Sequence, residues 1–329
     1  MMEQYLPEGF SGAVSVLLKG IPFFQKAYGY ADRSNRINNK VDTKFPTASA
    51  GKAFVAVGIM RLIREGYLSL DTTIGSVLNF DLQSIDPAIT VRQLLNHTSG
   101  IPDYFDETVM EEYAELFHDY PNYKIRSSKD LLPFFISKPM MYPAGERFQY
   151  NNSGYVMLGL MIECITGKPF DIYLKKSLFT PFRMNATGYY ELDRLPAKCA
   201  NAYIWDDRTH AFYTNIYSVD VKGTGAGGAF TTLPDIERFW LRLNENKVIS
   251  QEAFAMMTSP QAGNGRYGLG FWLTQEGIPY FQGSDPGVSF VSSFDIDQKN
   301  MITIVSNLGQ DVWKIHADIK KALIAISQQ

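Results

Sequence analysis

Cysteine is scarce in this sequence, and no long apolar run is present. Only Cys164 and Cys199 occur among 329 residues, too few for a disulfide framework or a four-thiolate metal site. No stretch reaches the roughly 20 uninterrupted apolar residues of a membrane helix, and Met1–Pro7 lacks the basic and apolar segments of a secretory leader. We therefore expect no membrane span and a cytoplasmic protein, or an extracytoplasmic one if a leader precedes this sequence.

Clusters of basic residues and of histidines are also missing. The 31 Lys and Arg residues nearly balance 34 Asp and Glu residues, giving a net charge of -3 without a basic block, so nucleic acid is not an expected partner. The histidines are scattered without the H-E-x-x-H spacing of a zinc hydrolase; they are His97, His118, His210 and His316. We expect neither a metal nor an organic cofactor.

What the chain does contain is apolar: 45% of its residues are hydrophobic and 14% aromatic. A chain of this length buries roughly three quarters of its unfolded surface, so it is globular, with two lobes or one domain carrying an insertion. Two β-runs, 13–18 and 23–28, are separated by Lys19-Gly-Ile-Pro22 and predict a hairpin. Further strands are predicted at 268–273, 288–294 and 301–306, followed by an amphipathic helix over 311–327, whose apolar stripe is Val312, Ile315, Ile319, Leu323 and Ile326.

The middle of the chain has a helical pattern. A helix apolar on every face is predicted from about 49 to 65, with Gly66 at its C-terminal end. Residues 70–210 are expected to be mainly helical with long loops, including a capping box at 90–93 and an apolar helix over 153–166. The predicted fold is α/β: an antiparallel sheet flanked by helices, built from residues 1–48 and 211–329, with a mainly helical domain inserted over 49–210. The cleft between the two is the expected site.

Two glycine motifs suggest nucleotide binding and fail on inspection. Ser49-Ala-Gly-Lys52 resembles the end of a phosphate-binding P-loop, but Pro46 stands where that loop needs glycine and Ala53 where it needs Ser or Thr. The run 223–228 matches G-x-G-x-x-G, yet the next helix signal, Pro234, comes several residues too late to place a helix under a pyrophosphate. A glycine-rich turn closing against a strand accounts better for the second run.

Ser49 and Lys52 remain as a candidate catalytic pair. The i,i+3 spacing places the ammonium beside the hydroxyl in the first helical turn, and burial lowers the pKa of a lysine, so a neutral amine can take the hydroxyl proton. The helix N-terminus also favours negative charge on an attacked carbonyl oxygen. By itself the S-x-x-K pattern is weak, because Ser and Lys are common at helix starts.

The surrounding motifs strengthen this reading. Phe45-Pro-Thr-Ala-Ser-Ala-Gly-Lys52, Leu94-Leu-Asn-His-Thr-Ser-Gly-Ile-Pro102 and Pro143-Ala-Gly-Glu-Arg-Phe-Gln-Tyr-Asn-Asn152 follow one another. Together they resemble the landmarks of the serine β-lactamase and penicillin-binding-protein-like hydrolases, in the branch with class C β-lactamases, D-aminopeptidases and related esterases. The segments 226–235 and 283–289 are similar to later parts of the same proteins. The resemblance covers nearly the whole chain and implies the same fold that the pattern predicts.

The resemblance also implies residue roles. Ser49 would be the acyl-accepting nucleophile and Lys52 its general base. Tyr150 would shuttle a proton between nucleophile and leaving group, as a phenolate if a nearby cation favours that form. Asn152 would orient Lys52 and bind the acyl side chain of the substrate. The backbone N–H groups of Ser49 and Ser284 would form the oxyanion hole.

The third motif departs from the family pattern. Phe281-Gln282-Gly283 stands where relatives have Lys-Thr-Gly or His-x-Gly, so a substrate-binding cation is missing and Gln282 offers only neutral hydrogen bonds. This weakens the case for carboxylate-bearing substrates, unless another cation such as Arg266 projects into the cleft.

We therefore expect a serine hydrolase that forms an acyl-serine intermediate on small esters or amides, from a small molecule or a short peptide. The alternatives are a D-Ala carboxypeptidase, D-aminopeptidase or β-lactamase acting on carboxylate-bearing substrates, and a non-catalytic penicillin-binding-like pseudoenzyme that binds peptide or cell-wall fragments. The oligomeric state stays open.

Overall fold

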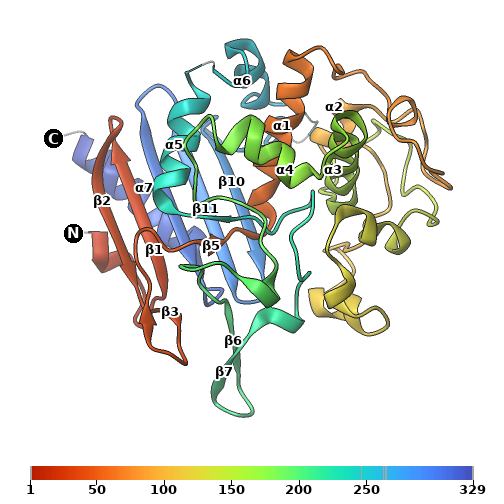
Figure 1. The fold of residues 1–329 in the computed structure, drawn as a ribbon. Helices are drawn as coiled ribbons and strands as arrows, with labels where there is room; N and C mark the ends of the chain where they lie inside the picture. The colour runs from red at the N-terminus through yellow and green to blue at the C-terminus, as the bar shows by residue number, and fades with distance from the viewer. Residues whose placement is uncertain (1, 246, 262, 264, 328–329) are drawn as a thin grey trace.

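The computed structural model describes residues 2–245, 247–261, 263 and 265–327. Its centre is a six-stranded antiparallel sheet in the order β2-β1-β12-β11-β10-β9 (Figure 1). The strands are β1 (Gly12–Leu18), β2 (Ile21–Tyr28), β9 (Trp272–Leu273), β10 (Pro279–Asp285), β11 (Val288–Asp295) and β12 (Asn300–Ser306). Because β1 pairs with both β2 and β12, the two ends of the chain meet in one sheet.

The N-terminal hairpin predicted from sequence is confirmed, with a tighter connection. Only Lys19 and Gly20 separate β1 from β2, and both have positive φ values, 53° and 77°. Two consecutive left-handed residues match the right-handed twist of the strands they join. The shorter loop explains why β2 already begins at Ile21.

The C-terminal sheet differs from the prediction at β9 and β10. Of the strand expected over 268–273, only Trp272–Leu273 has strand conformation. A strand that the pattern did not predict, β10, pairs with β11 from Tyr280 opposite Ser293 to Asp285 opposite Val288. The sequence of β10 contains proline, glycine and no β-branched residue, so its strand propensity is low and the pairing with its neighbour decides its conformation.

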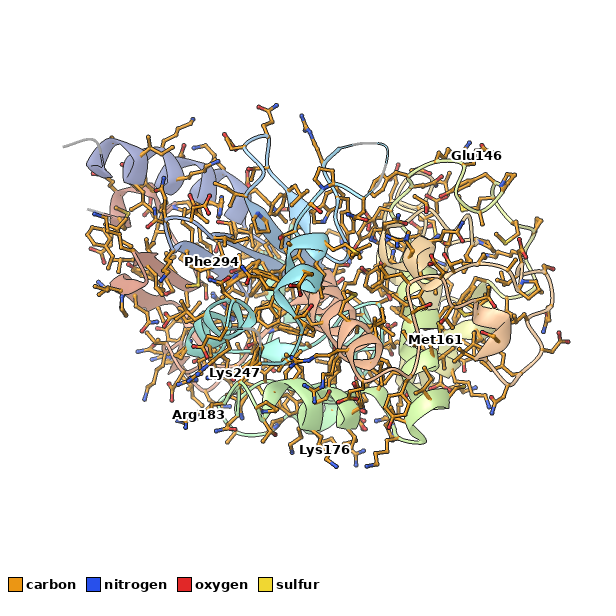
Figure 2. The ribbon with its side chains drawn as sticks, turned by 90° about the horizontal axis from the view of Figure 1, so that it is seen from above. Glu146, Met161, Lys176, Arg183, Lys247 and Phe294 are labelled. Carbon is orange, nitrogen blue, oxygen red and sulfur yellow. The ribbon has the colours of Figure 1, made fainter. Side chains whose placement is uncertain are left out.

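Helices cover both faces of the sheet. On one face, α7 (Val312–Ser327) packs against β11 and β12 (Figure 1). The first four predicted stripe residues of α7 are buried there; the side chain of Ile326 lies outside the described part. On the other face lies α5 (Leu233–Leu243), followed by α6 (Gln251–Met257). Viewed from above, Phe294 and Met161 lie inside the molecule, whereas Glu146 and Lys176 lie at its periphery (Figure 2).

The predicted buried helix is confirmed, in two parts. A 3-10 turn, η2 (Ala48–Gly51), runs directly into α1 (Lys52–Arg64). Ten of the thirteen α1 residues are buried, as expected for a helix that is apolar on every face. Gly66 follows in the left-handed conformation, with φ at 79°, which ends the helix.

The middle of the chain contains less regular helix than predicted. The capping box at Thr90 and Gln93 begins α2 (Val91–Leu95), and the apolar helix is α3 (Asn152–Thr166), which ends at the left-handed Gly167. After it come α4 (Phe170–Leu174) and the π-turn η7 (Lys175–Phe179). The rest is loop and short 3-10 turns: η3 (Ile74–Ser76), η4 (Tyr113–Phe117), η5 (Asn122–Lys124), η6 (Ser128–Phe134), η8 (Leu192–Arg194) and η9 (Asn215–Tyr217).

Three small strand pairs complete the fold. They are β3 (Tyr30–Asp32) with β4 (Ile37–Asn38), β5 (Phe45–Pro46) with β8 (Phe230–Thr231), and β6 (Tyr203–Asp206) with β7 (Ala211–Thr214). The hairpin β6–β7 lies across the boundary that we predicted at residue 210. The division into domains 1–48 with 211–329 and 49–210 stays a prediction, because one continuous apolar core joins α1 and α3 to the sheet. None of the helices in the described part of the chain has the length and apolarity needed to cross a bilayer.

Candidate active site

Ser49 lies in the short turn η2, between strand β5 and helix α1. The residue before it, Ala48, has a φ of 48°, a left-handed conformation that costs a residue with a Cβ about 1–2 kcal/mol. The turn is held from one side: the N–H of Gly228 donates to the carbonyl of Ala48 at 3.0 Å, and the N–H of Thr47 donates to that of Ala229 at 2.9 Å. The half-buried Ser49 side chain faces the cavity described below.

Lys52 is buried behind Ser49, with 2% of its surface exposed. Its Nζ lies 3.0 Å from Ser49 Oγ and 2.8 Å from Asn152 Oδ1, and it also donates to the carbonyl of Ala226. Burial lowers the pKa of Lys52 to about 8, and the negative charge of Glu107 partly opposes that shift. A substantial fraction of the amine is therefore neutral in mildly alkaline solution, as general-base chemistry requires.

Asn152 is the first residue of α3, and Asp103 holds it in place. The carboxylate of Asp103 accepts the N–H of Asn152 at 2.8 Å, the N–H of Ser153 at 3.0 Å and the side-chain amide of Asn152 at 3.2 Å. Because the amide nitrogen is bound to this carboxylate, Asn152 Oδ1 faces Lys52. Burial raises the pKa of Asp103 to about 6. Sequence reasoning missed Asp103, although it directly follows the Leu94–Pro102 landmark.

The side chain of Tyr150 also lies close to Lys52 and borders the cavity beside Ser49. Lys52 Nζ lies 5.0 Å from the centre of the Tyr150 ring. Burial raises the pKa of Tyr150 well above its usual value, so the phenol stays protonated. The expected stabilisation of a phenolate by a nearby cation is outweighed here by desolvation, and the hydroxyl is available as a proton donor.

Two glycines allow the backbone to close around Ser49. A Cβ on Gly283 of β10 would lie 2.7 Å from the backbone nitrogen of Ser49, and one on Gly227 would lie 2.5 Å from the carbonyl of Ala48. The run 223–228 is thus a glycine-rich turn, bridged between Thr224 and Gly227 and followed by strand β8. It also supplies the carbonyl of Ala226 to Lys52, a contact that sequence reasoning missed.

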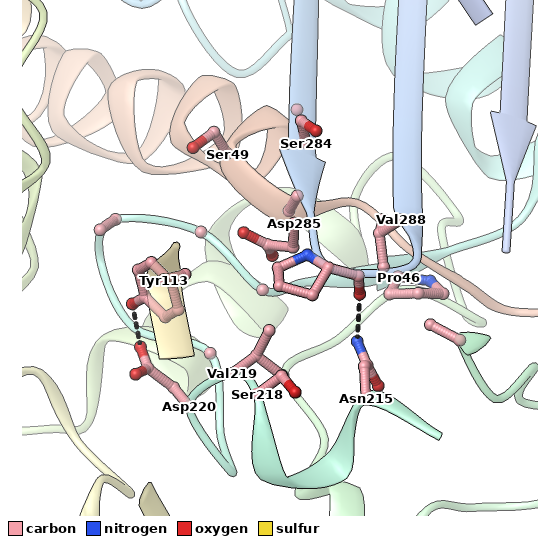
Figure 3. Close-up of a pocket in the computed structure, with 18 of the residues that line it drawn as sticks. Pro46, Ser49, Tyr113, Asn215, Ser218, Val219, Asp220, Ser284, Asp285 and Val288 are labelled. Carbon is pink, nitrogen blue, oxygen red and sulfur yellow. Dashed lines mark hydrogen bonds between the residues drawn. The ribbon is translucent and has the colours of Figure 1, made fainter. Parts of the chain in front are cut away.

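The predicted third-motif residues have different surroundings in the structure, because Gln282 and Ser284 line the cavity and Phe281 is buried. Ser284 and Ser49 lie on neighbouring elements at one side of the cavity (Figure 3). Gln282 also lines the cavity, and its Oε1 accepts the indole N–H of Trp313 at 2.7 Å. Phe281, which we expected to bind substrate, is 2% exposed. Its ring packs against the rings of Phe54, Phe239, Trp240, Phe271 and Phe290.

The structure thus corrects the role of Phe281. Side chains alternate between the two faces of a strand, and Phe281 is on the face that packs against α1 and α5. The residue is part of the aromatic core beneath the site.

A cavity of about 1100 Å³ opens beside Ser49, Tyr150 and Asn152. Among the described residues that line it, the charged ones are all acidic: Glu107, Glu111, Glu112, Asp220 and Asp285. Arg266, considered above as a substitute cation, is not among them. In Figure 3, Asp220 bonds to the hydroxyl of Tyr113, at 3.1 Å, on the far side of the cavity from Ser49, with Asp285 between. Burial raises the pKa of both aspartates to about 7.

A serine hydroxyl, a buried amine and a phenol around one cavity suit acyl transfer. Among the described residues, no group of three His, Cys, Asp or Glu side chains is arranged to hold a metal ion.

Comparison with known proteins agrees with this geometry. The family profile described as Beta-lactamase matches residues 3–324. Penicillin-binding protein 4* of Bacillus subtilis (strain 168) is 28% identical over 337 residues, which cover 95% of this chain and 71% of that protein. The crystal structure of a penicillin binding protein from Bacillus halodurans is 34% identical and superposes with a TM-score of 0.91 over 98% of each chain.

A D-amino acid amidase from Ochrobactrum anthropi SV3, complexed with D-phenylalanine, shares the fold at 22% identity and a TM-score of 0.78, over 99% of this chain and 98% of its own. The profile match extends over almost the entire chain. The protein therefore belongs to the β-lactamase-like family of serine hydrolases.

Proposed function

We propose that the protein hydrolyses esters or amides through a covalent acyl-Ser49 intermediate. The observation that carries this proposal is the bonding of Lys52 Nζ to Ser49 Oγ at 3.0 Å within a site that lowers the pKa of the amine to about 8. A neutral amine at this distance accepts the hydroxyl proton as the oxygen attacks. The same contacts argue against a pseudoenzyme, because a binding module has no need of a buried, proton-accepting lysine.

The reaction would proceed in two halves. In the first, Ser49 Oγ bonds to the substrate carbonyl carbon while its proton moves to Lys52, and the N–H groups of Ser49 and Ser284 bind the carbonyl oxygen as it becomes negative. Tyr150 donates its proton to the leaving alcohol or amine, the bond to the leaving group breaks, and Lys52 reprotonates Tyr150. In the second half, water attacks the acyl carbon and gives a proton to Lys52. The bond from that carbon to Ser49 Oγ breaks, and Lys52 returns the proton to Oγ, which frees the acid and restores Ser49.

The acidic lining of the cavity favours some acyl donors over others, according to their charge. A carboxylate entering a cavity lined by Asp220, Asp285 and Glu107 would meet charge of its own sign, whereas a neutral or cationic group would not. We therefore propose neutral and amine-bearing substrates, rather than penicillins or peptides recognised by a terminal carboxylate. The amidase fold neighbour, complexed with a D-amino acid, makes D-amino acid amides a natural first series.

The covalent step is tested with a short p-nitrophenyl ester and a fluorophosphonate probe. We expect a burst of p-nitrophenol stoichiometric with enzyme, and a single labelled peptide containing Ser49. Ser49→Ala should abolish both, while its circular dichroism spectrum and melting temperature match those of the unchanged protein. Hydrolysis at an undiminished rate in Ser49→Ala would overturn the assignment of the nucleophile.

The charge preference is tested with matched substrates at pH 7, where most of an α-amine is protonated and Asp220 and Asp285, whose pKa values are raised to about 7, are partly ionised. D-alanine p-nitroanilide and its N-acetyl derivative differ chiefly in one positive charge. We expect the free amine to have the higher kcat/KM, by about 10-fold or more, since a charge-assisted hydrogen bond contributes roughly 1.5–3 kcal/mol. Asp285→Asn should shrink that ratio. Benzylpenicillin should acylate slowly; efficient penicillin turnover would favour the carboxylate-recognising alternative instead.

A further inference from the structure

His97 lies just beyond α2 in a strained backbone conformation. Its φ is 59°, in the left-handed region that glycine adopts freely and residues with a Cβ adopt at a cost. Only 1% of its surface is exposed. The mechanism above does not use this imidazole, although it belongs to the landmark that follows Leu94. Its contacts must compensate the strain, and three of them involve Tyr150 or its two neighbours in the chain.

His97 holds the backbone on both sides of Tyr150. The N–H of Gln149, the residue before Tyr150, donates to the carbonyl oxygen of His97 at 3.0 Å. The N–H of Asn151, the residue after Tyr150, donates to Nδ1 of the His97 ring at 3.1 Å. His97 thus accepts one hydrogen bond from the peptide N–H on each side of Tyr150, in the loop before α3.

These bonds also determine the state of the imidazole. Because Nδ1 accepts a backbone N–H, it carries no proton, and the proton of the neutral ring is on Nε2. Nε2 lies 3.0 Å from the hydroxyl of Tyr267 and donates to it. Burial and the nearby Lys52 charge hold the pKa of His97 well below its usual value, which agrees with a neutral ring of one tautomer.

The rings of His97 and Tyr150 are also in contact. Their centres are 4.5 Å apart at an angle of 39°. The ring of Trp272 also stacks on Tyr150, with the ring centres 5.8 Å apart and the ring planes at 20°. Tyr150 lines the same cavity as Ser49, so the position of its ring sets the position of the hydroxyl relative to the nucleophile. A displacement of about 1 Å of a reacting group is enough to slow a chemical step by about 100-fold.

We propose that His97 is a positioning residue, which holds Tyr150 beside Ser49 by accepting the Asn151 N–H at Nδ1. The proposal rests on the proposed function, since it names what aligns the proton donor of that reaction. His97 touches no reacting atom, so its effect acts entirely through Tyr150.

Three substitutions separate the hydrogen bond from the backbone strain. In His97→Asn, Oδ1 replaces Nδ1 as acceptor, and asparagine tolerates a positive φ. His97→Gln retains a polar atom near the Nε2 position and loses the Nδ1 acceptor. His97→Gly relieves the strain and has no side-chain acceptor. Tyr267→Phe is the matched control, because it removes only the partner of Nε2.

We expect the kcat of ester hydrolysis to stay within about threefold of the unchanged enzyme in His97→Asn and Tyr267→Phe. In His97→Gln and His97→Gly it should fall about 10- to 100-fold, with KM changed by less than about twofold, because binding groups are untouched and alignment is lost. If His97→Gly or His97→Gln keeps full kcat, or if His97→Asn falls as far as they do, the positioning role is wrong. Thermal melts identify any variant that loses activity by unfolding.

Amide hydrogen exchange gives a second readout that needs no catalysis. The Asn151 amide should lose protection in His97→Gln and His97→Gly and keep it in His97→Asn. The Gln149 amide, which bonds to the backbone of His97, should stay protected in all three and serves as an internal control. An Asn151 amide equally protected in every variant would overturn the proposal. Absence of Ser49 labelling in the unchanged protein would instead overturn the proposed function, and the exchange data would still decide the restraint by His97.

Discussion

The titration of Lys52 is the residue-scale property that should set the pH dependence of the reaction. The amine acts as a base only when neutral, and its pKa is lowered to about 8 by burial. Its neutral fraction rises as the pH rises through that value, so activity is present above it and lost below it. We expect kcat/KM to increase from pH 6 to pH 9 with an apparent pKa near 8, measured with a neutral ester whose own charge does not change.

Glu107 provides a test of that assignment at a distance from the amine. Its negative charge stabilises protonated Lys52 and raises the pKa of the amine. In Glu107→Gln the acid limb of the kcat/KM profile should therefore move to lower pH. Glu146→Gln, at the periphery of the molecule (Figure 2), is the control and should leave the profile in place. A limb that stays at the same pH in Glu107→Gln would mean that another group titrates there.

Phe281 is the residue whose environment departs furthest from the expectation from sequence. A histidine at this position would place an imidazole inside an aromatic core, next to Phe54 and Trp240, and not in the cavity. We expect Phe281→His to lower the free energy of unfolding by about 2 kcal/mol or more, measured by urea denaturation. The ratio of penicillin to ester turnover should not increase, and a clear increase would show that the side chain reaches substrate.

At the scale of the elements, η2 lies in close contact with the glycine-rich turn and with β10, and these contacts fix the position of Ser49. Gly227 has a φ of 153°, and a Cβ there would lie 2.5 Å from the carbonyl of Ala48 and 3.1 Å from the Cα of Ser49. Gly227→Ala must therefore displace the turn that carries Ser49. We expect kcat to fall by about 10-fold or more, with a loss of stability of about 1–3 kcal/mol.

Gly263→Ala is the matched control for this substitution. A Cβ on Gly263 would meet no atom within 4 Å, and its φ is not in the left-handed region. Ester hydrolysis and the urea midpoint should stay unchanged. If Gly227→Ala behaved in the same way, the glycine would not be needed for the approach of the two backbones.

At the scale of the whole molecule, the sheet depends on pairing between the two ends of the chain. Strand β1 lies between β2 and β12, and its Ala13, Val14 and Val16 are fully buried. Deletion of residues 2–28 would expose the apolar surfaces of β12 and α7 together with unpaired backbone groups. We expect the shortened chain to lack a cooperative urea transition, and a synthetic 2–28 peptide to restore it in part. Cooperative unfolding of the shortened chain alone would contradict this account.

Features that depend on neighbouring residues could be predicted from the sequence. Apolar periodicity located the N-terminal hairpin, α1, α3 and α7, and local capping located the start of α2 at Thr90. The S-x-x-K spacing put the Lys52 amine beside the Ser49 hydroxyl, because both are on one helical turn. The motif order brought the resemblance to the β-lactamase family, which the profile match shows.

Features that depend on contacts between distant segments could not be predicted in this way, because folding alone brings those segments together. Strand β10 has little propensity of its own, and pairing with β11 makes it a strand. Strand alternation then puts Phe281 in the core while its neighbour Gln282 lines the cavity. The pKa of Lys52, the support of Asn152 by Asp103 and the bracketing of Tyr150 by His97 all come from burial and from bonds across about 50 to 170 residues of chain. Such desolvation and long-range hydrogen bonding leave no trace in local sequence.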